Sequence, residues 1–395
     1  MTEYKKKLLI VSSLFPPHLG GVEQYTASLA AALAPSHEVT VVCLNTENQP
    51  ACRTNSGYTV YFLPCFPAFG GRLPLPGISA LKTFSSYCRQ NAVDFGVIQT
   101  RLYPFNLWAA RCFKRSRIPH ILIEHGSGHI DYGSRVVNLL WKIYEHALTL
   151  GFRFFTQSYY GVSSGSLKWL AHFGIHGKGV LHNGITPDNF NTILPFDRKK
   201  FRIPSDAAII TFAGRIIREK GILVLLEAFS RWSPENVHLV IAGSGDMELV
   251  QRWRRNPSIH FAGQLAHPEI LSLLSESSLF CLPTMYPEGL PTVLIEAGFL
   301  GKAVVTTVAG GIGDLVQDGE SGRFVEAGNV DQLAAVLHDL MTDPLERDRL
   351  GNNLRQRVRT GFVWPEICLK LERIISEMCP EPADSRNGFD FSENT

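Results

Sequence analysis

The sequence predicts an α/β protein made of two doubly wound, mainly parallel sheets. Short apolar, β-branched runs alternate with stretches of helical periodicity along the whole 395-residue chain. The alternation occurs twice, because residues 184–206 interrupt it with Gly184, Pro187, Pro195 and Pro204. Hydrophobic residues make up 45% of the chain and charged residues 19%, which is typical of globular domains with a buried core. We therefore expect two Rossmann-like domains that face a cleft, with ligands at the carboxyl ends of the strands.

The first half opens with a strand, a glycine loop and a helix. Strand 7–12 is followed by Gly20-Gly21 and then by a helix over 22–34, whose apolar residues have helical spacing. The further strands predicted in this half lie at 38–44, 58–63, 95–99, 119–124 and 160–163.

The second half repeats the scheme, with helices expected at 221–230 and 291–301. A late helix is expected at 362–378, and the polar tail 380–395 is expected to be disordered. The strands predicted in this half lie at 208–213, 237–242, 258–262, 278–282, 302–306 and 322–325. The predicted domains are 1–187 and 188–361, followed by the helical segment 362–379.

Charge is distributed unevenly between the two halves. Residues 1–190 hold 17 Lys/Arg and 9 Asp/Glu, whereas residues 191–395 hold 21 and 27. The first half therefore suits an anionic partner such as a membrane surface, a pyrophosphate-linked acceptor or nucleic acid. The eight scattered cysteines form no C-x-x-C pair and are expected to be reduced, buried thiols of a cytoplasmic protein. The apolar run near the start is too short for a signal peptide, and no spanning helix is predicted.

Two carboxylates flank the start of the helix predicted at 291–301. Glu288 ends a loop, and Pro291 suits the first turn of the helix. Glu296 lies more than a turn inside, among apolar residues, where a carboxylate needs partners. Ribose hydroxyls could donate to Glu296, and the loop at Gly289 and Leu290 could face an anion. The alternative is that both carboxylates are structural, and their spacing favours neither interpretation.

A second candidate group follows the first strand of the second half. Gly214-Arg215-Ile-Ile-Arg-Glu-Lys220-Gly221 leads into a helix. Arg215 and Lys220 supply two cations close to a helix N-terminus, an arrangement that suits a diphosphate. The alternative is a solvated basic turn.

Three further loops carry candidate residues. Gly243 and Gly245 form a G-x-G turn after a strand, and Gly20 and Gly21 permit close backbone approach to a ligand. His125 ends a strand and is expected to point into the cleft, although a histidine at such a position is more often structural.

Glu288, Glu296 and the residues around them, E-G-L-P-x-V-L-I-E-A, resemble the donor-binding signature of a large family. This is the GT-B retaining glycosyltransferase family 4, also described as glycosyl transferases group 1. The motifs G-R-x-x-x-x-K-G, G-x-G and P-P-x-x-G-G-x-E fall in the order that the family requires. The resemblance spans about residues 7–378 and implies a GT-B fold whose C-terminal helix crosses back onto the first domain.

The resemblance also implies roles for these residues. Glu288 would bond hydroxyls of the donor sugar and Glu296 the nucleotide ribose, while Arg215 and Lys220 would neutralise the leaving diphosphate. Gly214 belongs to the same loop as these cations. Other positions would contact the donor through the phosphates, the nucleobase or the sugar O6: Gly20, Gly21, Gly289, Leu290, Pro291, Gly243, Gly245 and His125. Asn183-Gly184-Ile185 matches a family turn, but the Asp that usually follows is Thr186 here, so no role is carried onto it. Gly310-Gly311-Ile312-Gly313-Asp314 likewise departs from the more frequent G-G-x-P-E.

The implied reaction transfers a hexosyl unit with retention from a nucleotide-diphospho-sugar to an acceptor hydroxyl. UDP is slightly preferred over GDP, and bacterial polysaccharide or lipid-linked glycan synthesis is the expected setting. No D-x-D pair stands at a predicted strand end, so no metal or other cofactor is expected.

The apolar stretch 135–155 contains Lys142 and Arg153 and leads into aromatic residues. One interpretation is a core helix before a buried strand. The other is a basic, aromatic surface that makes peripheral contact with an anionic membrane, on its cytoplasmic inner face.

Other functions fit the sequence less well. A sugar-nucleotide 2-epimerase of GT-B architecture would lack the Glu-x7-Glu signature, and an inactive sugar-nucleotide-binding scaffold would not need the intact charged residues. A nicotinamide-dependent dehydrogenase would carry G-x-G-x-x-G after the first strand, where this chain has Gly-Gly-Val-Glu. Nucleic-acid binding would rest on charge alone and is not predicted.

Overall fold

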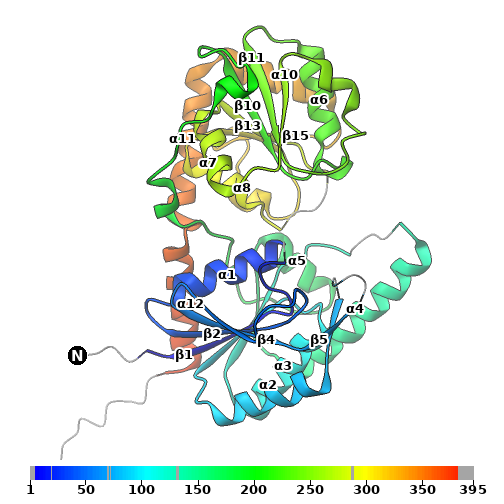
Figure 1. Ribbon diagram of the computed structural model, residues 1–395, viewed down its shortest axis with the longest axis vertical. Coiled ribbons are helices and arrows are strands. Elements are labelled where there is room, and N and C mark those ends of the chain that lie inside the picture. Colours follow the sequence, from blue (N-terminus) through cyan, green and yellow to red (C-terminus); the bar gives the residue numbers. More distant parts are fainter. Residues whose placement is uncertain are drawn as a thin grey trace, which may run out of the picture. The chain divides into compact units, whose positions relative to one another are not determined.

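A computed structural model describes residues 5–18, 20–68, 71, 73–129, 133–285 and 289–380. The chain forms two compact units, each built from separate stretches of sequence. Unit 1 contains residues 1–123, 139–159 and 368–395, and unit 2 contains residues 124–138 and 160–367. Both carry a parallel sheet covered by helices (Figure 1), so the predicted α/β class is confirmed.

The first sheet has seven strands in the order β3-β4-β2-β1-β7-β8-β9. Strands β1, β2, β4, β7 and β8 pair in parallel, and their side chains are mostly buried. Strands with both faces covered read as continuous apolar runs, which is why the sequence revealed them. The strands are β1 (Lys7–Val11), β2 (Glu38–Leu44), β3 (Cys52–Asn55), β4 (Tyr58–Leu63), β7 (Phe95–Gln99), β8 (His120–Glu124) and β9 (Tyr159–Gly161).

Three strands of the first half were not predicted. The edge strand β3 pairs antiparallel with β4, and β5 (Cys65–Ala68) forms a two-stranded hairpin with β6 (Leu73–Pro76). Polar residues dominate β3, while Pro67, Pro74 and Pro76 give the hairpin the composition of a loop.

The second sheet has six parallel strands in the order β12-β11-β10-β13-β14-β15. Helix α6 packs against α10 on one side, while α8 packs with α7 and α11 on the other (Figure 1). The order reverses between β10 and β13, and ligands of doubly wound sheets bind beside such a reversal, at the carboxyl ends. The strands are β10 (Ala208–Ala213), β11 (Val237–Ala242), β12 (Ile259–Gly263), β13 (Leu279–Leu282), β14 (Ala303–Thr307) and β15 (Arg323–Val325).

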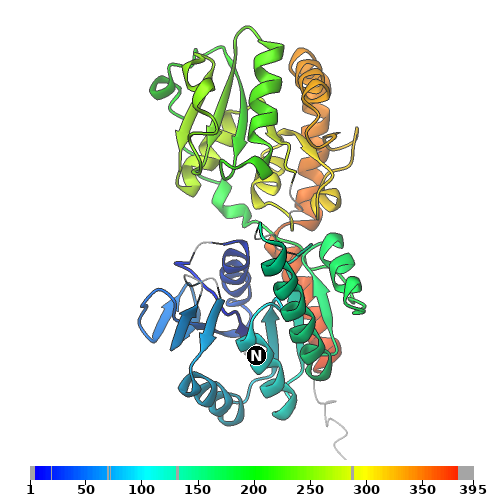
Figure 2. The same cartoon turned by 90° about the vertical axis from the view of Figure 1, so that its right-hand side faces the viewer.

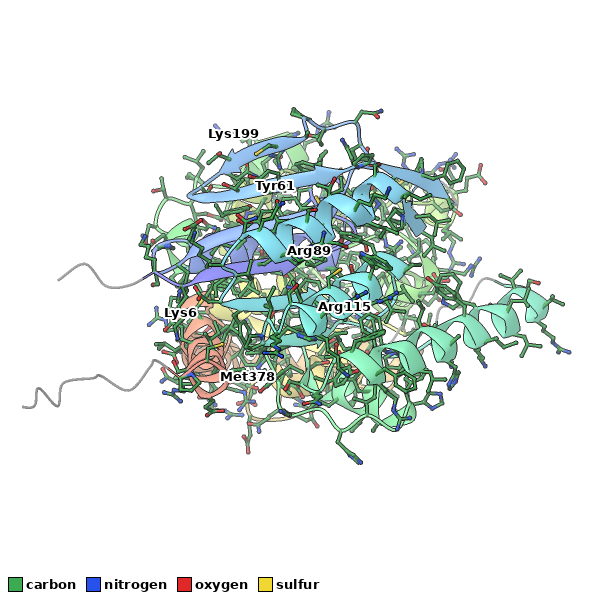
Figure 3. All side chains as sticks on the ribbon, turned by 90° about the horizontal axis from the view of Figure 1, so that it is seen from below. Lys6, Tyr61, Arg89, Arg115, Lys199 and Met378 are labelled. Atoms are coloured by element: carbon green, nitrogen blue, oxygen red, sulfur yellow. The ribbon has the colours of Figure 1, made fainter. Side chains whose placement is uncertain are left out.

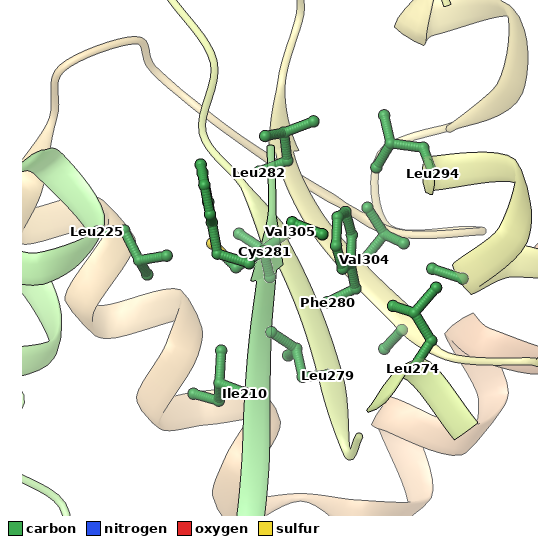
Figure 4. Close-up of a cluster of buried hydrophobic side chains, with 14 of the residues drawn as sticks. Ile210, Leu225, Leu274, Leu279, Phe280, Cys281, Leu282, Leu294, Val304 and Val305 are labelled. Atoms are coloured by element: carbon green, nitrogen blue, oxygen red, sulfur yellow. The ribbon is translucent and has the colours of Figure 1, made fainter. Parts of the chain in front are cut away.

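The core of unit 2 lies on both faces of the second sheet. Ile210 of β10 and Phe280 of β13 are fully buried in the centre, and Leu225 of α6 and Leu294 of α8 reach this cluster from the covering helices (Figure 4). The helix that begins beside the predicted active residues is therefore anchored through its apolar face.

The helices include those predicted at 22–34, 221–230, 291–301 and 362–378. None of the described helices is long and apolar enough to cross a membrane. The helices are α1 (Gly21–Leu33), α2 (Ile78–Gln90), α3 (Pro104–Arg115), α4 (Arg135–Phe155), α5 (Ser164–His172), α6 (Ile222–Trp232), α7 (His267–Glu276), α8 (Thr292–Phe299), α9 (Ile312–Leu315), α10 (Val330–Thr342), α11 (Pro344–Gly361) and α12 (Trp364–Met378).

The interpretation of residues 135–155 as a core helix is wrong. Helix α4 forms there, but a set of its apolar side chains is exposed, and the same helix faces the viewer in Figure 2. Only one helical face packs inward, through residues such as Phe152, which is fully buried. The exposed apolar side chains are Val136, Val137, Leu139, Leu140, Ile143, Leu150 and Phe154.

The second part of α12 belongs to unit 1. Leu371 and Ile375 are almost fully buried, and the Lys6 ammonium donates to the carbonyl oxygen of Cys379 at 3.2 Å. Unit 1 thus joins the early and late parts of the described chain. All eight cysteines are free thiols, but the prediction that they are buried is wrong for Cys52, which is exposed, and for Cys65 and Cys379, which are half-buried. The tail predicted to be disordered lies beyond Pro380, outside the described residues. The domain boundaries and the cleft remain predictions.

Candidate active site

The loop after β10 carries Arg215 and Lys220 and is fixed at its far end. The amide of Met285, which follows β13, donates to the carbonyl of Glu219 at 2.7 Å. Gly221 adopts φ +72°, and a β-carbon there would overlap the carbonyl oxygen of Pro283. Only glycine combines this left-handed backbone with such a close approach. The two cations therefore stand on a loop whose end is held against the neighbouring strand.

Arg215 is exposed, and Lys220 is half-buried. Across the ranges that the structure describes, the guanidinium of Arg215 has neither a hydrogen bond nor an ion pair. Five donors on a fixed loop are thus available to an anion at the carboxyl ends of the strands.

The loop after β11 packs directly on the arginine loop. Gly243 and Gly245 adopt φ +142° and +153°, and a β-carbon on either would overlap the backbone of the arginine loop. The carbonyl oxygen of Ile216 also accepts a hydrogen bond from the amide of Asp246, at 2.9 Å. These glycines are therefore required for packing between two loops. Their contact with a nucleobase stays a prediction, as does any ligand contact of Gly214.

Glu296 is buried in α8 and already has a protein partner. Its Oε1 lies 2.8 Å from Nε2 of His267, the first residue of α7. This hydrogen bond raises the pKa of His267, against the opposite effect of burial. His267 is thus the donor that the buried Glu296 needs, and it was not among the residues predicted from the sequence. A signal was present, since His267-Pro268 starts a helix soon after the predicted strand 258–262.

Glu288 lies outside the described residues, but the segment after it is well defined. The Asn183 side-chain amide donates to the carbonyl of Leu290 at 2.7 Å, and Leu290 is buried. Pro291 then caps α8 with extended backbone. Asn183 of the matched N-G-I turn therefore fixes the entry into the helix that carries Glu296.

His125 stands immediately after β8 and close to this segment within unit 2. A β-carbon on Gly289 would lie 3.3 Å from the carbonyl oxygen of His125. The amides of His125 and Gly126 both donate to Oε1 of Glu124, at 3.0 and 2.8 Å. Glu124 is thus a structural residue that the sequence analysis did not single out.

Burial lowers the pKa of His125 to about 3, although part of the residue reaches solvent. The imidazole is therefore neutral near pH 7. A neutral ring can donate to or accept from a hydroxyl but does not neutralise a phosphate.

Gly20 and Gly21 belong to unit 1, at the start of α1. A β-carbon on Gly20 would overlap the carboxylate of Glu23, which is buried and lies 3.1 Å from Nδ1 of His18. Gly20 thus makes room for this carboxylate. Around Gly21 no heavy atom of the described chain lies within 4 Å of a β-carbon, so that residue leaves open space.

Asp314 ends the segment that departs from G-G-x-P-E, and it has protein partners. Its two oxygens accept from the Ser164 amide at 2.6 Å and the Ser164 hydroxyl at 2.5 Å, and His182 Nε2 lies 3.3 Å away. Burial acts to raise the pKa of Asp314, but these hydrogen bonds hold it below its usual range. The carboxylate caps the N-terminus of α5, so its role is structural.

The structure thus gathers most candidate residues in unit 2. Arg215, Lys220 and the G-x-G loop lie at the carboxyl ends of β10 and β11, and Glu296 lies in the helix after β13. Cations, a buried carboxylate and a neutral imidazole together could bind a ligand with phosphate and hydroxyl groups.

Comparison with known protein families agrees with this arrangement. Residues 195–357 match the family described as glycosyl transferases group 1, and residues 19–189 match glycosyltransferase family 4. The chain belongs to the GT-B glycosyltransferases of family 4 and is a hexosyltransferase.

Similar proteins match along nearly the whole chain. A GDP-mannose-dependent monoacylated alpha-(1-6)-phosphatidylinositol monomannoside mannosyltransferase of Corynebacterium glutamicum is 22% identical, over 94% of this chain and 98% of its own. Sucrose-phosphate synthase of Thermosynechococcus elongatus has a TM-score of 0.75 at 20% identity, covering 94% of this chain and 99% of that one. Anabaena HepE, solved with UDP and glucose, has a TM-score of 0.71 at 18% identity, with coverage of 94% and 99%. At these identities the solved structures support the fold.

Proposed function

We propose that this glycosyltransferase moves a hexosyl unit, with retention, from a nucleotide-diphospho-sugar to an acceptor hydroxyl. The observation that carries the proposal is Arg215, an exposed guanidinium without a protein partner in the described chain, on a loop packed between two neighbours. A UDP-sugar is slightly preferred over a GDP-sugar. The relatives include a GDP-mannose-dependent enzyme and a protein solved with UDP, so both bases occur among similar proteins.

Each site residue has a role in this reaction. Negative charge grows on the leaving diphosphate in the transition state, where Arg215 and Lys220 would stabilise it more than in the ground state. Glu288 would hold the sugar hydroxyls, and Glu296, oriented by His267, would hold the ribose. The neutral His125 would bond a sugar hydroxyl. Backbone at Gly20, Gly21, Gly289 and Leu290 would lie against the phosphates.

The proposed step needs neither a metal nor a protein nucleophile. The bond between the anomeric carbon and the diphosphate oxygen breaks, and the bond to the acceptor oxygen forms on the same face. The acceptor proton passes to the departing phosphate. The absence of a D-x-D pair at a strand end of the sequence supports the metal-free form.

The donor can be found and the reaction tested with one set of experiments. A panel of UDP- and GDP-sugars should reveal the donor as the one that raises the unfolding temperature, because ligands of the folded state stabilise it. With that donor, the anomeric proton coupling of the product should show the donor's configuration, and EDTA should leave turnover unchanged. An inverted product would contradict retention. Activity lost to EDTA and restored only by added metal would contradict the metal-free step.

Helix α4 supports a lipid-linked acceptor in polysaccharide or glycan synthesis at the cytoplasmic face of a membrane. Its exposed apolar side chains recur at helical spacing, from Val136 to Phe154. Arg135, Lys142 and Arg153 are exposed beside them, whereas Glu145, the one acidic residue of the helix, is buried. This pattern suits an anionic lipid surface. A second copy of the chain, with its α4 packed antiparallel on this helix, would instead bring the arginines and lysines of the two helices together.

We expect Leu140→Gln to weaken sedimentation with phosphatidylglycerol vesicles about tenfold, because an inserted leucine side chain contributes about 1.5 kcal/mol or more. Leu345→Gln is the matched control, since Leu345 is 83% exposed but lies on α11. Equal effects of both variants, or no sedimentation of the unmodified protein at low salt, would refute membrane contact through α4.

A further inference from the structure

A polar pocket of about 320 Å³ opens between α2 and α3 of unit 1. Three arginines line it, Arg89 from α2 and Arg111 and Arg115 from α3, with Trp108 and Cys112 among the other lining residues. Figure 3 shows Arg89 and Arg115 on the two helices, which lie side by side. The site predicted from the family motifs uses none of these residues.

The two helices are held in place by aromatic packing beneath the pocket. The ring of Phe84 lies 5.4 Å from that of Phe105 and 6.0 Å from that of Phe113, and all three are fully buried. The two helices that carry the arginines are therefore packed on a common buried core.

The Ser85 hydroxyl and the Trp108 indole of the pocket already bond to protein. The indole N–H of Trp108 donates to the Ser85 hydroxyl at 3.1 Å, and that hydroxyl donates to the carbonyl of Leu81 at 2.7 Å. The groups left to bind a ligand are guanidinium donors and the hydroxyl of Ser116, which also lines the pocket.

Among the residues that the structure describes, no carboxylate pairs with these arginines. In the described parts of the chain, neither Arg89, Arg111 nor Arg115 forms an ion pair. Residues 95–123 contain five Lys/Arg and no Asp/Glu, and α2 also lacks acidic residues. The Arg111 guanidinium lies 5.0 Å from the centre of the Trp108 ring, and Arg89 donates to Ser86 at 3.3 Å.

The pKa of the Cys112 thiol is affected by the charges of all three arginines. Burial raises its pKa, while the hydrogen bond with Ser85 and the charges of Arg111, Arg89 and Arg115 all act to lower it. All three positive charges therefore act on this thiol, and like charges that line one pocket repel one another.

We propose that this pocket binds a phosphate-bearing group. Guanidinium groups bind phosphate oxygens through paired, charge-assisted hydrogen bonds, and convergent arginines are suited to an anion with several oxygens. The volume accommodates a phosphate with part of the group to which it is attached. A lipid headgroup and a free phosphate share this chemistry. The pocket goes beyond the proposed transfer reaction, because no donor-binding residue contributes to it.

The test follows the indole N–H resonance of Trp108, assigned with Trp108→Phe, during titration with inorganic phosphate. The resonance should shift in a saturable way, and the double variant Arg111→Gln/Arg115→Gln should weaken binding at least ~10-fold. Lys82→Gln is the matched control, because Lys82 is an exposed cation of α2 that does not line the pocket. A circular dichroism melt confirms that each variant is folded. Because Trp108 lines the pocket, its indole resonance distinguishes phosphate bound in the pocket from phosphate bound near Arg215.

Vesicles distinguish the two sources of phosphate. If the pocket binds a lipid headgroup, the double variant should sediment less with phosphatidylglycerol vesicles than Lys82→Gln does. Equal sedimentation together with a phosphate-dependent indole shift would assign the pocket to soluble phosphates. An indole that does not shift, or a shift weakened as much by Lys82→Gln as by the double variant, would overturn the proposal.

Discussion

Arg215→Ala is expected to lower kcat at least ~10²-fold, the usual loss when one preorganised stabiliser of transition-state charge is removed. The loop that carries Arg215 is held by backbone contacts at Gly243, Gly245 and Pro283, so the substitution should leave its shape intact. A loss of similar size is expected for Lys220→Ala and for Glu288→Ala. Steady-state kinetics with the identified donor measure each effect.

Arg218→Ala is the matched control for this prediction. Arg218 is an exposed arginine of the same loop, three residues after Arg215, and its amide carbonyl closes the turn into Gly221. Its side chain has no assigned role, so kcat should change little. If Arg215→Ala and Lys220→Ala fold and have the rates of the unmodified protein, the site assignment is refuted. If Arg218→Ala loses as much activity, the loss comes from the net positive charge of the loop and not from a specific contact of Arg215.

Gly221→Ala is expected to lower the free energy of unfolding of unit 2 by about 3 kcal/mol. The left-handed backbone costs about 1–2 kcal/mol for a residue with a β-carbon, and overlap with the Pro283 carbonyl adds a packing cost of about 1–3 kcal/mol. Urea denaturation should show a lower midpoint for the transition of unit 2.

Gly313→Ala provides the control for the glycine substitution. Gly313 lies in α9, and a β-carbon there would meet no heavy atom of the described chain within 4 Å. Its effect should stay within about 0.5 kcal/mol, as for most surface substitutions. A Gly221→Ala midpoint that matches that of Gly313→Ala would show that the loop accommodates a side chain by moving.

The parallel strands of both sheets were predictable because they are apolar on both faces, whereas the polar, antiparallel edge strand β3 was not. The runs at 38–44 and 237–242 became β2 and β11 with unchanged bounds. Apolar content alone does not distinguish a buried helix from an exposed one, and for this reason the core interpretation of α4 failed.

The sequence also placed the candidate loops correctly at the ends of strands, but it did not reveal what their residues contact. His267 and Glu296 are 29 residues apart, and Asp314 and Ser164 are 150 apart. Spacing carries no information about such pairs, since the fold alone brings them together. The arginines of α2 and α3 escaped notice for the same reason, because their two segments are separated by β7.

The composition of unit 1 has a consequence for how the protein is made. Its helix α12 supplies buried residues such as Leu371 and Ile375, and its residue Cys379 accepts a hydrogen bond from Lys6. During translation these late residues leave the ribosome after the whole of unit 2, because they follow it in the sequence. Domains fold as their residues emerge. Unit 2 can therefore complete its core while unit 1 still lacks a helix. Until α12 arrives, the nascent unit 1 exposes apolar surface that chaperones would recognise.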